Sequence, residues 1–234
     1  MFSKDLLSRR NFFVLAGATG AGLLAGCSKS VPPRAAATFT AIEALERQHG
    51  LTRRALAVMD KIRHGIDAQM DISPETAGGA VAIISDFMIN CHQLMEEKFI
   101  FPVFAATKNT ADLIAVLRQQ HGAAFKLTDI LKPLCAGLSQ KDQENRRKTV
   151  NMIHLLTRMT LAHESWEDTA LFPLLRVAVP GKSYEELSYE FEQAENQFLG
   201  QGGINRTLEK IAGFETILGM GNLGSFTPRP QDLS

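Results

Sequence analysis

The pattern of apolar and polar positions divides the chain into four long segments with helical periodicity. Apolar residues recur every three or four positions in each segment, as in helices that turn one face towards a core. Ser73 followed by Pro74 is typical of a helix start, and Thr110 and Ser139 are further candidate N-caps. We therefore predict an all-α fold, with long helices near residues 39–70, 74–106, 110–137 and 140–179.

Two shorter helical patterns follow the fourth segment, which the Pro180-Gly181 pair closes. They cover residues 183 to about 198 and about 204 to 218, with glycines between them. Neither is long enough to bury a core of its own. We expect residues 181–234 to be a C-terminal helical extension that packs on a bundle formed by residues 39–180.

The long segments form an internal repeat. Gln48-His49-Gly50 recurs as Gln120-His121-Gly122, and the segment 92–103 recurs in similar form as 163–174. Each half is therefore a pair of helices that cannot bury both of its faces alone. We predict that the two halves dock with pseudo-two-fold symmetry into an up-down-up-down four-helix bundle.

A histidine interrupts the apolar face of each long helix. In the second and fourth helices a glutamate follows four positions later on the same face, because residues four apart differ by only about 40° around a helix. Carboxylates buried without partners are costly, and a pair of metal ions would resolve this because imidazoles and carboxylates are natural metal ligands. The candidate ligands are His49, His92, Glu96, His121, His163 and Glu167.

Two further acids, Glu97 and Asp168, come five positions after the second-helix and fourth-helix histidines. Five residues correspond to about 140° around an α-helix. We therefore expect these side chains to point away from the shared centre, towards solvent or a neighbouring helix. Helical phase thus favours Glu96 and Glu167 as the ligands, with carboxylates that could bridge two metal ions.

The order of a lone histidine, then HxxxE, then a lone histidine, then HxxxE resembles the hemerythrin-like (HHE cation-binding) domain over about residues 39–179. The resemblance implies that the six candidate ligands hold two iron ions. Oxygen-carrying members have a further histidine where this chain has Phe125, and an aspartate ligand at the spacing of Asp168. The four-histidine set is more similar to a divergent bacterial branch that includes iron–sulfur repair proteins and iron or oxygen sensors. We expect Phe125 to wall the metal pocket.

Counting coordination positions refines the expected function. Two six-coordinate irons offer roughly 12 positions, and the six ligands with a bridging oxygen fill about 10 of them. The remaining positions could take oxygen, nitric oxide or peroxide, so we expect a protein that binds or senses such a molecule. Alternatives are a di-iron redox enzyme that reduces peroxide or nitric oxide or oxidises iron, zinc or manganese in place of iron, and a metal-free interaction module on a membrane surface.

The first 27 residues resemble a bacterial export signal. The segment from Ser8 to Phe13 contains a twin arginine, residues 14–26 are apolar, and the segment ends in a lipobox at Cys27. The apolar stretch is shorter than the roughly 20 residues that span a bilayer. We expect cleavage before Cys27, lipid attachment to its sulfur, a flexible tether over residues 28–38, and a protein anchored on the periplasmic side of a membrane. An uncleaved anchor with a chance cysteine is the alternative.

Composition adds two points. The formal net charge of the 234-residue chain is zero, so nothing indicates a nucleic-acid partner. Cys91 and Cys135 both fall in apolar helical segments, so two buried free thiols are expected, although a disulfide between them is possible in an oxidising compartment.

Overall fold

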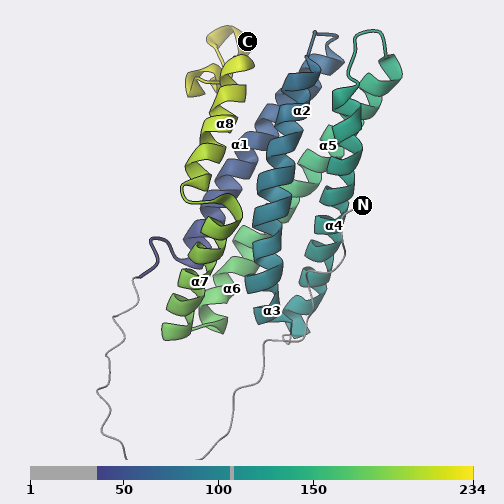
Figure 1. The fold of residues 1–234 in the computed structure, drawn as a ribbon. Helices are drawn as coiled ribbons and strands as arrows, with labels where there is room; N and C mark the ends of the chain where they lie inside the picture. The colour runs from purple at the N-terminus through teal and green to yellow at the C-terminus, as the bar shows by residue number, and fades with distance from the viewer. Residues whose placement is uncertain (1–35, 106–107, 234) are drawn as a thin grey trace, which may run out of the picture. The chain divides into compact units, whose positions relative to one another are not determined.

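A computed structural model describes residues 36–105 and 108–233 of the chain (Figure 1), and that part contains helices and no strands. The expected export signal, the lipobox Cys27 and most of the tether lie outside the described residues. Among the helices of the described part, none combines the length and the apolar character that crossing a bilayer requires.

Four long helical rods form the bundle that the sequence pattern predicts. The first is α1, the second and fourth are built from consecutive segments, and the third is α4. Their bounds are α1 Ala41–Asp67; α2 Pro74–Ile83, η1 Ile84–Gln93, η2 Glu96–Ile100 and α3 Phe101–Phe104; α4 Lys108–Ala136; and α5 Gln143–Trp166, η3 Glu167–Leu171 and α6 Phe172–Ala178. In Figure 1, α1 and α4 each lie beside both α2 and α5, so the four rods surround one core.

The helix starts follow local capping chemistry. Thr40 and Glu43 form a capping box at α1, and the Ser73 hydroxyl caps α2 with Pro74 at the first position, as expected. The other two expected caps differ. Thr110 lies inside α4, and Asp142 rather than Ser139 caps α5, because its carboxylate accepts the backbone N–H of Asn145.

Short π-helical turns replace the α-helix at both HxxxE elements. The N–H of Phe101 donates to the carbonyl of Glu96, and the N–H of Phe172 donates to the carbonyl of Glu167, five positions back in each case. A proline follows each turn directly. A proline ring clashes with the preceding turn and lacks an N–H, so a wider turn lets the rod continue past it.

The apolar core consists of two clusters with a polar layer between them. One cluster includes Leu56, Ile62 and Phe87, and the other includes Leu45 and Phe101. On the first, third and fourth rods the candidate metal ligands lie between the residues of one cluster and those of the other, whereas on the second rod His92 and Glu96 alternate with Cys91 and Met95 of the second cluster. The free cysteines are also separated, since Cys135 belongs to the first cluster and Cys91 to the second.

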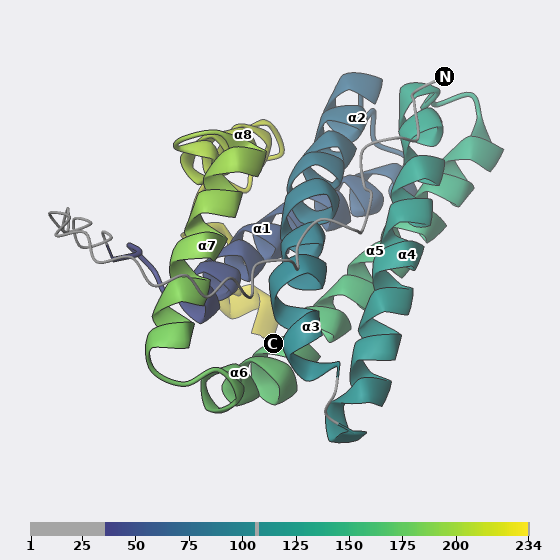
Figure 2. The same cartoon turned by 60° about the horizontal axis from the view of Figure 1, so that its bottom comes forward.

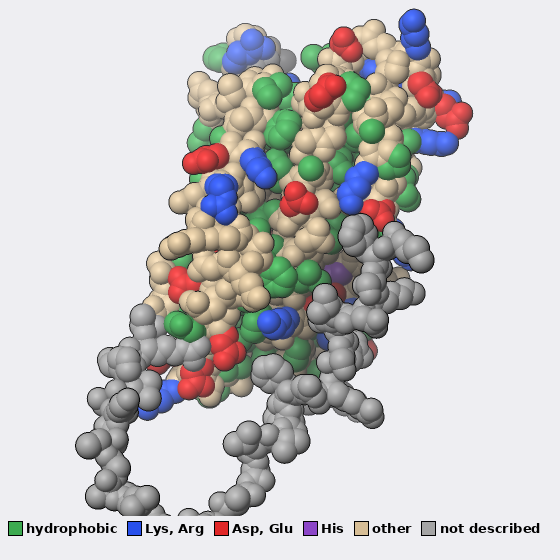
Figure 3. All heavy atoms as spheres, viewed as in Figure 1, with side chains coloured by type: hydrophobic (Ala, Val, Ile, Leu, Met, Phe, Trp, Pro, Cys, Tyr) green, Lys and Arg blue, Asp and Glu red, His purple; other side chains and the backbone are tan. Residues whose placement is uncertain are grey.

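The two C-terminal helices, α7 Lys182–Leu199 and α8 Gly203–Ile217, pack on one side of the bundle. Figure 2 shows both beside α1 and away from α4, in agreement with their contacts to α1, η1 and α2. Phe191 of α7 and Ile211 of α8 are fully buried in the two clusters. The surface view in Figure 3 shows acidic and basic side chains interspersed, with no large area of one sign on that face.

Candidate metal centre

The four histidines of the repeat meet in the polar layer as two pairs. The Nε2 atoms of His49 and His92 are 3.1 Å apart, and those of His121 and His163 are 3.2 Å apart. All four side chains are buried. One pair joins the histidines of the first and second rods, and the other joins those of the third and fourth rods.

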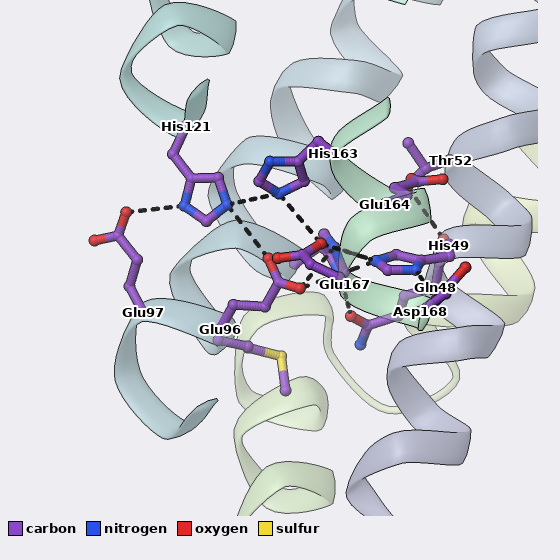
Figure 4. Close-up of polar contacts among 12 residues, drawn as sticks. Gln48, His49, Thr52, Glu96, Glu97, His121, His163, Glu164, Glu167 and Asp168 are labelled. Atoms are coloured by element: carbon purple, nitrogen blue, oxygen red, sulfur yellow. Dashed lines mark hydrogen bonds and ion pairs between the residues drawn. The ribbon is translucent and has the colours of Figure 1, made fainter. Parts of the chain in front are cut away.

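Two glutamates lie between the pairs and reach both (Figure 4). One oxygen of Glu96 is 3.3 Å from Nε2 of His92, and its other oxygen is 3.4 Å from Nε2 of His121. Oε2 of Glu167 lies 3.5 Å from Nε2 of His49 and 3.2 Å from Nε2 of His163. The six residues therefore form two groups of four potential ligands that share both carboxylates, with the atoms of each group within 4.8 Å of one another.

The donor set fits a pair of metal ions. All four carboxylate oxygens of Glu96 and Glu167 are buried and lack a hydrogen-bond partner among the described residues. Burying an ionised carboxylate without compensation costs several kcal/mol. Two cations bound to the two histidine pairs would satisfy these oxygens and offset their charge.

The pKa values of the two glutamates also fit a site that binds cations. Burial raises the pKa of Glu96 well above its usual range, and the charge of Glu167 adds to the rise. Burial also opposes ionisation of Glu167, but the nearby imidazoles of His163 and His49 favour its charged form and bring its pKa below the ordinary value. Without a cation, the layer therefore favours one protonated and one ionised glutamate.

Each histidine also contacts an oxygen atom through its outward-facing nitrogen. The four Nδ1 contacts are His49 with Asp168 at 2.7 Å, His92 with Gln48 at 2.8 Å, His121 with Glu97 at 2.9 Å and His163 with Gln120 at 2.9 Å. Carboxylate and amide oxygens accept hydrogen bonds, so every Nδ1 acts as a donor. This tautomer leaves the Nε2 lone pairs facing the centre, as metal ligation requires.

The roles of Glu97 and Asp168 were not foreseen from the sequence. Both were expected to point away from the centre, and neither belongs to the two ligand groups. They face a neighbouring helix, as expected, and each accepts a hydrogen bond from a histidine of that helix.

His49 lies between two acids. Burial opposes its protonation, but the hydrogen bond with Asp168 and the nearby carboxylate of Glu167 outweigh burial and raise its pKa to about 10. Burial lowers the pKa of His92 and of His121. Because a metal ligand must offer a free lone pair, metal binding would displace a proton from His49.

A further buried acid, Glu164, lies next to the candidate ligand His163. Its Oε2 is 2.9 Å from Nε of Arg53, which also contacts Asp168. Burial raises the pKa of Glu164 to about 7, although His49 and Arg53 favour its charge. The sequence pattern did not mark Glu164, because its environment depends on an arginine of another helix.

The aromatic wall of the site differs from the expectation. Phe125, which the sequence suggested as a pocket wall, is 52 % exposed. The rings stacked on the ligands are Phe172, 5.4 Å from the ring of His49, and Phe101, 5.3 Å from the ring of His121. Phe125 follows His121 by four positions, and at this point of α4 that spacing faces outwards, whereas Phe101 and Phe172 follow the π turns and face inwards.

Comparison with known proteins agrees with this geometry. The family model described as hemerythrin HHE cation-binding domain matches residues 40–139 and 112–201. Uncharacterised proteins of Mycobacterium bovis and of two strains of Mycobacterium tuberculosis are 30% identical over 226 residues, which cover 92% of this chain and 88% of each relative. No solved structure gives a significant match. The chain belongs to the hemerythrin HHE cation-binding domain family.

Proposed function

We propose that this protein is a non-heme di-iron protein that binds or senses oxygen or a related small molecule. The observation that carries the proposal is the pair of buried glutamates, Glu96 and Glu167, which lie between two histidine pairs and whose oxygens accept no hydrogen bond within residues 36–105 and 108–233. Iron rather than zinc or manganese is proposed because the family resemblance implies it. Bound iron would supply a redox-active Lewis acid with about two coordination positions open to a small ligand.

The chain itself contributes orientation, charge and exclusion of water. The Nδ1 contacts hold the imidazoles in one tautomer and one direction. The shared carboxylates, together with Glu97 and Asp168 behind His121 and His49, supply negative charge suited to divalent or trivalent ions. Phe101 and Phe172 cover the imidazole faces, so a small ligand would meet an apolar wall.

Absorption spectroscopy tests this proposal. The iron-loaded chain should show charge-transfer bands of oxidised iron that disappear on reduction and return or shift on exposure to oxygen. A fully loaded chain that is spectroscopically silent would contradict the choice of iron. Absorption bands that do not change when oxygen, nitric oxide or peroxide is added would contradict binding of such a ligand. Sustained consumption of peroxide or nitric oxide in the presence of a reductant would instead indicate the redox-enzyme alternative.

The proposed location is the periplasmic side of a bacterial membrane, with a lipid on Cys27. The twin-arginine and lipobox motifs support it. The twin-arginine route carries folded proteins, which suits a chain that binds its metal before export. Membrane fractionation of the wild-type chain and of a Cys27→Ala variant tests the proposal, because only the wild type should remain with the membrane. Equal recovery of both in the soluble fraction would contradict it.

A further inference from the structure

Glu195, on the C-terminal helix α7, lies behind the metal centre without touching it. Its side chain is only 9 % exposed. One of its oxygens accepts a hydrogen bond of 2.8 Å from Nε2 of Gln48, and Arg47 donates to both oxygens at 3.0 and 2.8 Å. The carboxylate therefore has firm partners and a fixed place in the structure.

This contact decides which way the Gln48 amide faces. A carboxylate can only accept hydrogen bonds, so Gln48 must turn its NH2 group towards Glu195. Its carbonyl oxygen then faces Nδ1 of His92, 2.8 Å away, and accepts the proton there. Glu195 thus acts through Gln48 to keep the Nε2 lone pair of His92 directed into the centre.

The other half of the repeat lacks this support. Gln120, the repeat equivalent of Gln48, accepts from Nδ1 of His163 at 2.9 Å, but it is partly exposed. No carboxylate hydrogen-bonds to its amide among the residues that the structure describes. The reason is topological, because α7 occurs once and packs mainly against the side of the bundle formed by α1 and η1.

The position of α7 is itself well fixed. The hydroxyl of Ser188 accepts the backbone N–H of Ala41 at 3.0 Å in a buried contact near the start of α1. Phe191 is fully buried, with its ring 5.8 Å from that of Phe99. Glu195 lies one turn further along the same buried face and therefore approaches Gln48 from a rigid element.

We propose that Glu195 is a positioning residue that makes the metal position held by His49 and His92 the tighter of the two. The C-terminal extension is then part of the metal centre, and it breaks the two-fold equivalence of the sites. This inference rests on the proposed function only in that the centre binds two metal ions. Replacing a group that orients a ligand histidine in this way typically weakens metal binding 10–100-fold.

Zinc titration of the metal-free full-length chain, followed by competition with a chromophoric chelator, tests the inference. The wild type should bind two equivalents. Glu195→Leu should weaken one of them roughly 10–100-fold and leave the other nearly unchanged. Glu195→Gln, which keeps an acceptor oxygen, should restore most of the affinity. Glu192→Gln is the matched control, because Glu192 lies one turn earlier on α7 and accepts only an exposed backbone N–H from Thr38.

Two further measurements separate positioning from a general loss of structure. The His121→Ala variant keeps the metal position formed by His49 and His92, so adding Glu195→Leu to it should still weaken zinc binding. Adding Glu195→Leu to the His92→Ala variant should leave zinc binding unchanged. Nitrogen NMR of the metal-free chain should show His92 protonated at Nδ1 in the wild type and a mixture of tautomers in Glu195→Leu.

The outcomes are distinguishable. Two equivalents weakened to the same degree, or neither weakened, would overturn the role of Glu195 while leaving the two-metal centre intact. A wild-type chain that is folded but binds no zinc or iron would instead overturn the proposed function together with this inference. Circular dichroism of each variant identifies the folded samples to which the comparison applies.

Discussion

The Nδ1 atom of His49 lies 2.7 Å from Oδ1 of Asp168, a residue of the opposite half of the repeat. The reciprocal contact joins His121 of the second half to Glu97 of the first at 2.9 Å. Each half of the repeat thus provides a carboxylate that accepts a hydrogen bond from a histidine of the other half. The metal centre consequently depends on correct docking of the two halves as well as on the fold of each.

Removing Asp168 should therefore weaken metal binding although Asp168 is no ligand. Asp168→Ala leaves Nδ1 of His49 without its acceptor, so the imidazole can rotate or change tautomer. We expect a 10–100-fold loss of affinity for at least one metal ion, measured by competition with a chelator. Asp60→Ala is the control, since Asp60 pairs only with side chains on the surface of α1. Equal affinities of the two variants would rule out this role.

The ligand histidines should be individually necessary. His92→Ala and His163→Ala each remove one imidazole from a different pair, so each variant should lose at least one of two bound metal ions. Elemental analysis per folded chain provides the measurement. His154→Ala serves as control because this side chain is exposed on α5. Retention of two ions in either ligand variant would show that the histidine is not a ligand.

The stability of the metal-free protein should decline with rising pH. The pKa of His49 is raised from 6.5 to about 10 in the folded chain. The folded state therefore holds this proton more tightly than the unfolded chain does, and the resulting stabilisation is fully present below about pH 6.5 and is lost as the pH rises towards 10. Thermal unfolding of the metal-free chain between pH 6.5 and 9 should show a falling Tm.

Metal binding should show the opposite trend over the same range. Because binding displaces the proton from His49, affinity should increase as the pH rises from 6.5 towards 10. The gap in Tm between the metal-loaded and the metal-free protein should widen accordingly. A gap that narrows with rising pH would contradict the assignment of His49 as a ligand.

A neighbouring pair of glycines tests how α8 docks on α2. A Cβ at Gly79 would lie 2.4 Å from the ring of Phe214, whereas a Cβ at Gly78 would meet nothing within 4 Å. Gly79→Ala should destabilise the protein by about 1–3 kcal/mol through overpacking. Gly78→Ala should leave stability unchanged or raise it by up to about 1 kcal/mol, since alanine favours helix. Denaturant unfolding measures both, and equal effects would refute this packing.

Periodicity and repetition were sufficient to predict the four rods, the two C-terminal helices and the grouping of the six candidate ligands. A histidine or glutamate on an apolar face is visible in the sequence because it breaks a regular pattern. The residues that support the ligands are not visible in this way. Gln48, Glu97 and Glu195 are ordinary polar residues by position, and their importance arises from contacts between elements distant in the chain.

The wrong expectation for Phe125 and the missed role of Asp168 have different causes. Phe125 was chosen because it occupies the position of a further histidine in oxygen-carrying members, whereas Asp168 was placed with the geometry of an ideal α-helix. The π turns at Glu96–Ile100 and Glu167–Leu171 change the direction of the side chains that follow, and sequence periodicity contains no sign of them beyond the prolines. The rings of Phe101 and Phe172 consequently take the place that Phe125 was expected to fill.

The most direct test of the two-metal centre is the metal content of the full chain after passage through the proposed export route, compared with a Glu96→Ala, Glu167→Ala double variant. Both carboxylates are shared by the two histidine pairs. We expect about two iron ions per folded wild-type chain and a near-complete loss of iron in the double variant. A folded wild-type chain without bound metal, or a double variant that keeps both ions, would contradict it.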